Sequence, residues 1–199
     1  MSSIRLKNRF EQDINSMSPI GHLITAASLS TAYMRFNTVS WADGISNLPK
    51  SIIEAQGIEP HSSTAITLIG LGILLGARGP DRLELPVFNK RKKVRMSLIP
   101  HRTLTHWPLL WVTLTVLSLF GMGNTQDTLF IAMSYVGLGF CVASWLHLAM
   151  DIMTPSGIPL YSPFGQKTSL NIYKTSSVGE WRCIFVFVFL TQSVSILLT

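Results

Sequence analysis

The chain has 199 residues, of which 13% are charged and 47% are hydrophobic, and its mean hydropathy is +0.36. A soluble domain carries about 25% charged residues, so this composition excludes an ordinary soluble domain and favours an integral membrane protein. The formal net charge is +6, but the basic residues concentrate in the N-terminal tail and one loop, which indicates membrane orientation and argues against nucleic acid as a partner.

The N-terminal tail, residues 1–18, carries Arg5, Lys7 and Arg9. The apolar stretch that follows begins near Ile20, contains His22 and lacks a convincing cleavage site, which is unlike a signal peptide. We therefore interpret this stretch as a retained membrane anchor.

Five apolar segments follow one another along the chain and are predicted to be membrane-spanning helices. They cover residues 19–36, 63–77, 104–122, 128–153 and 181–198. The second segment is short for a span, which takes about 20 residues. The sequence thus predicts an all-α, polytopic helical bundle that forms a single integral-membrane domain over residues 1–199.

The connections between these segments differ in charge. The tail and the loop at residues 78–103 are rich in Lys and Arg, whereas the connection at residues 37–62 carries Lys50 against three acidic residues. Because positive loops stay on the cytoplasmic side, we expect the N-terminus and the loops at residues 78–103 and 154–180 to be cytoplasmic. This orientation predicts a multi-pass protein of the bacterial inner (cytoplasmic) membrane.

Six ionisable side chains fall at or near the predicted cytoplasmic ends of four segments, while His61 falls on the opposite face. The six are His22, Asp81, His101, His106, His147 and Asp151. Ionisable groups near hydrocarbon are costly, so a cluster of them in one leaflet suggests a functional site. Histidine and carboxylate together are the ligand set of hydrolytic metal centres.

Each part of this pattern also has a simpler explanation. His147 and Asp151 are four residues apart, which places them on one helix face, where the histidine could merely bond to the carboxylate and cap the helix. His101 and His106 could be two interfacial histidines, and Asp81 follows Pro80 as in an ordinary turn. The coincidence of all of them on one side favours a metal site.

The chain resembles the YdjM-like family of bacterial inner-membrane proteins, described as metal-dependent hydrolases. The resemblance covers about residues 18–169 and rests on Gly21-His22-Leu23, Pro80-Asp81, His101-Arg102 with Thr105-His106, and His147-x-x-x-Asp151 followed by Thr154-Pro155-x-Gly157. It implies a bound divalent metal and hydrolysis at the membrane.

The sequence departs from the family pattern at three positions. The family's Pro-Asp-x-Asp becomes Pro80-Asp81-Arg82-Leu83-Glu84, which shifts the second acid by one position, so Glu84 is left out of the predicted ligands. Thr103 replaces a common Gly, and Trp107 replaces a common Ser, which could narrow access to the site.

We therefore predict a hydrolase with a cytoplasm-facing centre that holds zinc or manganese and acts on a lipid or phosphoester. Six ligands exceed the need of one tetrahedral ion, which leaves open either two ions or non-ligand roles for some groups. In a one-metal version Asp81 or Asp151 would accept a proton from water, and Arg102 would face developing negative charge. The alternatives are an ion-transporting or non-hydrolytic metal-binding membrane protein, and a structural protein whose histidines cap helices.

Overall fold

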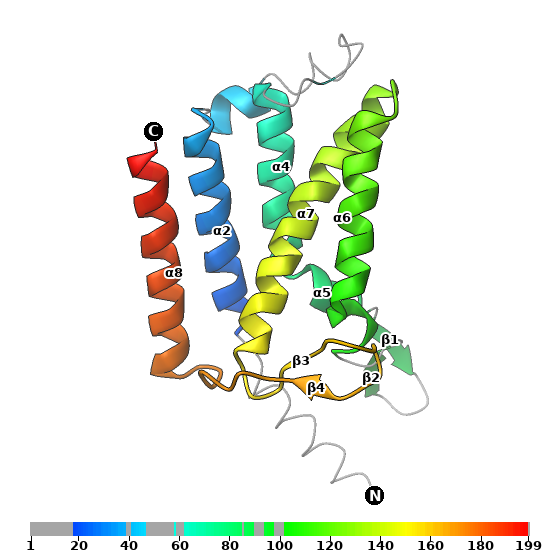
Figure 1. Cartoon of the computed structure of the whole chain (residues 1–199), viewed down its shortest axis with the longest axis vertical. Coiled ribbons are helices and arrows are strands. Elements are labelled where there is room, and N and C mark those ends of the chain that lie inside the picture. Colours follow the sequence, from blue (N-terminus) through cyan, green and yellow to red (C-terminus); the bar gives the residue numbers. More distant parts are fainter. Residues whose placement is uncertain are drawn as a thin grey trace, which may run out of the picture.

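The computed structural model describes residues 18–38, 41–46, 58, 62–84, 86–89, 94–97 and 102–198. Five longer helices lie roughly side by side (Figure 1): α2 (Pro19–Phe36), α4 (Ser63–Gly76), α6 (Pro108–Gly123), α7 (Thr128–Ile152) and α8 (Val178–Leu197). The short elements are a helix at residues 41–46, the helix α5 (Gly79–Arg82), the 3-10 turn η1 (Leu104–His106) and two antiparallel strand pairs. The pairs are β1 (Pro86–Asn89) with β2 (Val94–Ser97), and β3 (Ile158–Pro159) with β4 (Lys167–Thr168).

The prediction of a mainly helical protein is confirmed, with two corrections. The segment at residues 104–122 is not one helix, because residues 104–106 form the 3-10 turn η1 and the α-helix begins only at Pro108. Proline suits the first turn of a helix, where its missing N–H is not needed. The short strands were not predicted. Within the described residues, α7 and α8 are long and apolar enough to cross a membrane; the full set of five spans and the orientation of the N-terminus stay predictions.

Polar side chains explain where four of the longer helices begin. Each cap side chain accepts a hydrogen bond from a backbone N–H in the first turn, which would otherwise lack a partner. The caps are Ser18 for α2, Ser62 for α4, Asp127 for α7 and Ser177 for α8. The cap at Ser177 explains why α8 begins three residues before the apolar run predicted at residue 181.

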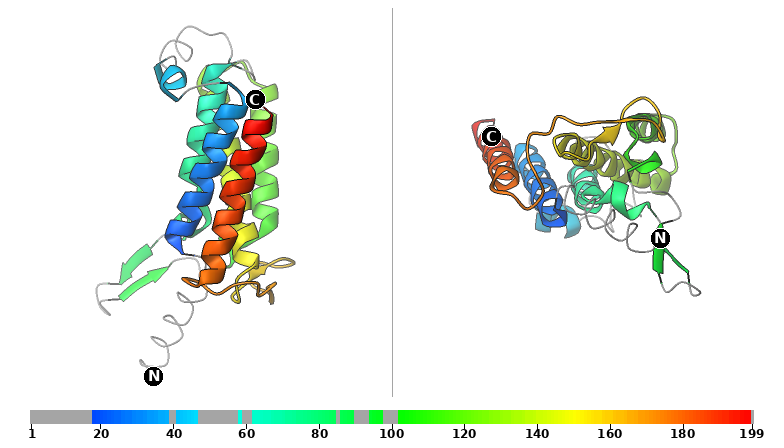
Figure 2. Two further views of the ribbon diagram at one scale, coloured as in Figure 1. Left: turned by 90° about the vertical axis from the view of Figure 1, so that its left-hand side faces the viewer. Right: turned by 90° about the horizontal axis from the view of Figure 1, so that it is seen from below.

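The close approach of α4 and α7 forms the centre of the bundle. A Cβ atom at Gly72 would collide with the backbone oxygen of Val136, and one at Gly139 would collide with that of Ile69. Glycines facing a neighbouring backbone allow two apolar helices to pack closely. α6 packs on the far side of α7, and α2 contacts both α4 and α8, so α8 and α6 lie at opposite edges of the bundle (Figure 2).

Polar contacts join α8 to α2 at the start of both helices and again further along them. The buried carboxylate of Glu180 accepts hydrogen bonds from the backbone N–H and the hydroxyl of Ser18, at 2.8 and 2.6 Å. Further along, the side-chain amide of Gln192 donates to the backbone oxygen of Ser28 at 3.0 Å. Most of the remaining surface of α8 is apolar and exposed, including Phe185 and Phe189.

The start of α2, the end of α7 and the short elements α5, η1, β3 and β4 all lie at one end of the bundle (Figure 1). The chain therefore brings pieces of several distant segments together at this end.

Candidate metal centre

The last turns of α7 supply two buried side chains, His147 and Asp151, each 1% exposed. Their spacing of four residues places Nε2 of His147 3.5 Å from Oδ2 of Asp151. The predicted shared face of this helix is thus present, and it points into the protein.

The turn η1 supplies His106, which is completely buried. Its Nε2 atom lies 3.3 Å from Oδ2 of Asp151 and 3.5 Å from Oδ1 of Asp81. Nε2 of His147 lies 3.7 Å from the same oxygen of Asp81. Two imidazole nitrogens therefore face two carboxylates, and the ligand atoms of Asp81, His106 and His147 all lie within 4.8 Å of one another.

The other ring nitrogen of each histidine is occupied. Nδ1 of His147 donates a hydrogen bond to the backbone oxygen of Ala77, directly after α4, at 3.1 Å. Nδ1 of His106 lies 3.1 Å from the hydroxyl of Thr105 and 3.5 Å from Oε1 of Glu84. A proton on Nδ1 leaves the lone pair of a neutral imidazole on Nε2, which is how metal-binding histidines are usually oriented.

These contacts test whether the residues fit a metal ion. Nε2 of His147 is buried and has no hydrogen-bond partner among the described residues. Nitrogen lone pairs and carboxylate oxygens that face each other at this distance repel one another unless a proton or a metal cation lies between them. The donor set of two imidazoles and two carboxylates is one that divalent transition metals bind, so the residues fit.

Arg102 lies behind Asp151. Its guanidinium group is 2.5 Å from Oδ1 of Asp151 and also donates to the backbone oxygen of Gly157 at 3.1 Å and to the hydroxyl of Thr154 at 3.3 Å. The side chain is 2% exposed. Arg102 has a positive φ of 56°, a conformation that is uncommon outside glycine, and its backbone N–H donates to Oε1 of Glu84 at 2.9 Å.

His22, near the start of α2, completes the cluster. Its ring stacks on that of His147 with a centroid separation of 3.7 Å and an angle of 10° between the planes. Its Nε2 atom lies 3.7 Å from Oδ1 of Asp151, the oxygen that also contacts Arg102. His22 therefore contacts the cluster through His147 and Asp151.

Asp81 and His106, which lie outside the long helices, have shifted pKa values. Burial alone would raise the pKa of Asp81, but contacts with His106 and His147 lower it below its ordinary range. Burial alone would lower the pKa of His106, but the carboxylates of Asp151 and Asp81 raise it. Both shifts have the same cause, which is the short distance between the imidazoles and the carboxylates.

The structure thus brings together five of the six side chains predicted as ligands, as well as Arg102. The sixth, His101, lies outside the described residues, as does His61. The assignment of these side chains as metal ligands or catalytic groups stays a prediction.

Sequence reasoning missed three groups around the cluster. Glu84 was set aside, yet it contacts His106 and the backbone of Arg102. Thr105 and Thr154, which contact His106 and Arg102, were quoted only as parts of motifs. The signal for Glu84 was the second acid of the family pattern, because a longer side chain one position later reaches the same neighbourhood.

Comparison with known proteins agrees with the resemblance. Residues 17–198 match a family model described as YdjM inner membrane protein. No curated protein and no solved structure matches the chain. The family match spans all five longer helices and every described residue of the cluster.

Proposed function

Because the chain belongs to the YdjM inner membrane protein family, we propose that it is a membrane-bound hydrolase with a single divalent metal ion at this cluster. The observation that carries the proposal is the orientation of His106 and His147. Both present Nε2 to the carboxylates of Asp81 and Asp151, while both Nδ1 atoms face oxygen atoms behind the rings.

The contacts favour one ion over two. The cluster contains two groups that could hold a metal, but both of them need His147. Nδ1 of His147 is bonded to Ala77, so only Nε2 is left, and it can bind one ion. The group that contains His22 also uses Asp151, and the guanidinium of Arg102 already neutralises Oδ1 of that carboxylate. A second cation there would be repelled by Arg102.

We assign three side chains as ligands and one as a proton acceptor. His106, His147 and Asp151 are nearly or fully buried, and three protein ligands plus water is the common pattern of a catalytic zinc site. Asp81 is 27% exposed, so it lies where water and substrate reach the cluster. Zinc or manganese fits this donor set.

The metal ion, when bound, would polarise the substrate and lower the pKa of a water molecule. The residues of the chain do the rest. Asp81 accepts a proton from water, because its carboxylate is 27% exposed and lies at the side of the cluster that water can reach. Arg102, expected from the sequence to face charge on the substrate, instead contacts Asp151, so we propose that it holds this carboxylate with Oδ2 toward the histidines.

The exposed surface of the helices supports a place in the membrane. α6 and α8 expose many large apolar side chains, among them Val116, Phe120, Phe185 and Phe189. Soluble monomers rarely expose so many large apolar side chains along two helices. We propose that the helices cross the inner membrane several times with the metal centre at the cytoplasmic end. A lipid or another phosphoester is the substrate class this location favours.

An ion-transport role is less well supported. Several hydroxyl groups along the described helices donate to backbone oxygens of their own helix: Thr25 donates to Gly21, and Ser134 donates to Phe130. Ser30 donates to Gly70 of the neighbouring helix at 3.0 Å. Such hydroxyls stabilise packing and do not form a continuous path for ions.

The proposal is tested by assaying protein purified in detergent against a soluble phosphodiester, a phosphomonoester and short-chain phospholipids. We expect hydrolysis that a chelator abolishes and that zinc or manganese restores, together with a metal-dependent rise in thermal stability. Asp151→Asn is expected to remove both effects, whereas Asp127→Asn, at the other end of α7, is expected to keep them. Wild-type protein with no hydrolysis and no response to metal would contradict the proposal.

A further inference from the structure

The segment between α7 and α8 exposes large apolar side chains. Tyr161 is 90% exposed and Phe164 is 74% exposed, and Leu170 and Ile172 are each 57% exposed. In the described part of the chain no side chain or helix covers these four. Exposed aromatic residues that are grouped in this way mark a surface that contacts something other than water.

This segment has a defined backbone. β3 pairs with β4 through Ile158 with Thr168 and Pro159 with Lys167. The N–H groups of Leu170 and Ile172 donate to the backbone oxygens of Ile152, the last residue of α7, and Met153, which follows it, each at 2.7 Å. The apolar side chains are therefore displayed from a fixed scaffold at the end of the bundle.

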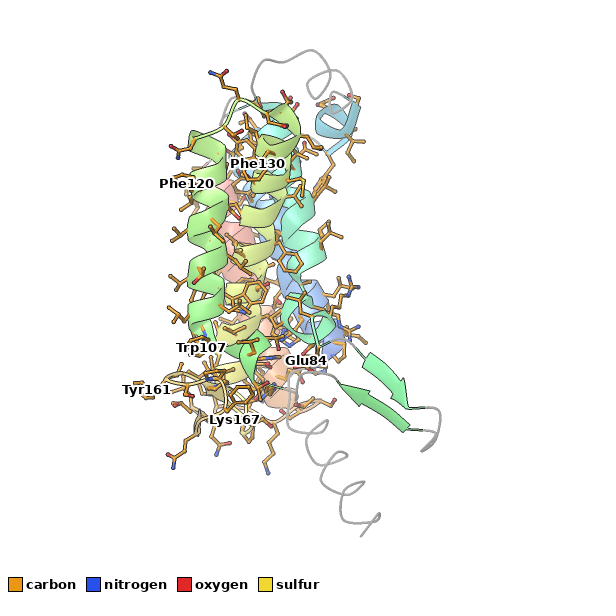
Figure 3. All side chains as sticks on the ribbon, turned by 90° about the vertical axis from the view of Figure 1, so that its right-hand side faces the viewer. Glu84, Trp107, Phe120, Phe130, Tyr161 and Lys167 are labelled. Carbon is orange, nitrogen blue, oxygen red and sulfur yellow. The ribbon has the colours of Figure 1, made fainter. Side chains whose placement is uncertain are left out.

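The location of Tyr161 points to the membrane interface. Figure 3 shows Tyr161 projecting sideways at the end of α6 near Trp107, with Phe120 at the opposite end of the same helix. The exposed apolar side of α6, which includes Leu109 and Val116, thus continues into this segment. Trp and Tyr at the ends of apolar helices are typical of the headgroup layer.

The charge of the segment fits anionic headgroups. Between residues 154 and 177 the only charged residues are Lys167 and Lys174, and both are exposed. Lysine beside exposed aromatic residues is the combination found in segments that lie on anionic membranes.

We propose that residues 158–174, here called the interfacial segment, lie in the headgroup layer on the side of the metal centre and bind anionic phospholipid headgroups. The proposal rests on the membrane location given under the proposed function. The segment is joined to the cluster, since Thr154 and Gly157, just before it, both accept hydrogen bonds from Arg102. Headgroups bound here would therefore lie next to the site that acts on them.

The test uses a fluorescent label on Phe164→Cys, with Cys183→Ser to remove the native cysteine that is partly exposed; Cys141 is buried. The full chain is placed in nanodiscs of phosphatidylcholine alone or mixed with phosphatidylglycerol. Quenching by a headgroup nitroxide lipid is compared with quenching by aqueous iodide. A label at Gln126→Cys, in the exposed loop at the other end of the bundle, is the reference.

We expect nitroxide quenching at position 164 to exceed that at position 126 and to rise about twofold when phosphatidylglycerol is present. The double variant Lys167→Gln, Lys174→Gln is expected to remove that rise. Dominant iodide quenching in both lipids would overturn the proposal, as would nitroxide quenching that does not depend on lipid charge. Protection from both quenchers would also overturn it, because a second protein would then cover the segment. The metal content of the same samples is measured separately, so loss of the metal proposal would leave this result interpretable.

Discussion

The guanidinium group of Arg102 lies 2.5 Å from Oδ1 of Asp151, and both side chains are almost completely buried. The other oxygen of the same carboxylate faces His106 and His147 at 3.3 and 3.5 Å. One carboxylate therefore contacts a permanent cation on one side and the proposed metal position on the other. This pairing fixes the direction in which Asp151 presents its second oxygen.

Arg102→Ala is expected to destabilise the protein by about 3–5 kcal/mol, because it leaves the buried carboxylate of Asp151 without its partner. Arg102→Lys keeps the charge but loses the forked donors of the guanidinium, which reach Asp151 and Gly157 together. The stability of this variant should therefore lie between that of Arg102→Ala and that of the wild type. Thermal unfolding in detergent with and without bound metal measures both effects. A wild-type melting temperature for Arg102→Ala would refute the role given to this pair.

Glu84→Gln is expected to weaken metal binding about 10–100-fold while the protein stays folded. The amide can still accept the hydrogen bond from the backbone of Arg102, but it loses the negative charge beside Nδ1 of His106. Competition with a fluorescent zinc chelator measures the affinity. Asp43→Asn is the control. It changes an exposed carboxylate that is not part of the cluster, so this variant should bind metal as tightly as wild type. Equal affinities for Glu84→Gln and wild type would show that Glu84 does not support His106.

Metal binding should weaken as the pH falls. A ligand histidine must lose its proton to bind, and the carboxylates of Asp151 and Asp81 raise the pKa of His106 above 6.5, so protons compete there at a higher pH than for a free imidazole. The pKa of Asp81 is lowered, so this carboxylate stays ionised over the same range. Below the pKa of His106 the affinity should fall roughly tenfold per pH unit, as expected for one displaced proton.

In the metal-free protein, the proton on His106 has the opposite effect: it stabilises the fold. A raised pKa for His106 means that the proton stabilises the fold at low pH and that this contribution is lost as the pH rises through the folded-state pKa. Thermal stability measured against pH with a chelator, and again with zinc, should therefore diverge most above that pKa. Parallel curves would indicate that His106 does not bind the metal.

Gly139→Ala is expected to destabilise the bundle by about 1–3 kcal/mol, since the new Cβ would collide with the backbone of Ile69 on α4. The change should also weaken metal binding, because α4 leads to Ala77, whose backbone oxygen orients His147. Gly123→Ala is the matched control, as no atom lies within 4 Å of its added Cβ. The measurement is the melting temperature of each variant, which should be lower for Gly139→Ala than for Gly123→Ala. Equal values would contradict the close packing of α4 and α7.

Local features of the site could be predicted from the sequence. The spacing of four residues between His147 and Asp151 requires only that their segment is a helix, and α7 confirms this. The apolar stretch at residues 19–36 was predicted with the observed bounds of α2, and the structure adds that Ser18 caps its first turn, which begins with proline.

The features that depend on tertiary contacts could not be predicted. A regular helix was expected from residue 104, whereas His106 lies in a 3-10 turn that aims its ring at Asp81 and Asp151. Hydrophobic periodicity does not report which distant groups meet, so the contact between Glu84 and His106 could not be derived. The sequence also could not show that Arg102 contacts Asp151. Arg102 was expected to face the substrate, whereas the structure pairs it with Asp151.

The most direct test of this account is the metal content of the full-length protein, purified gently in detergent and measured by elemental analysis beside the His147→Ala and Asp127→Asn variants. The account predicts close to one equivalent of zinc or manganese per chain in the wild type and in Asp127→Asn, and only a trace in His147→Ala. Only a trace in the wild type, unchanged in His147→Ala, would contradict it, as would two equivalents per chain.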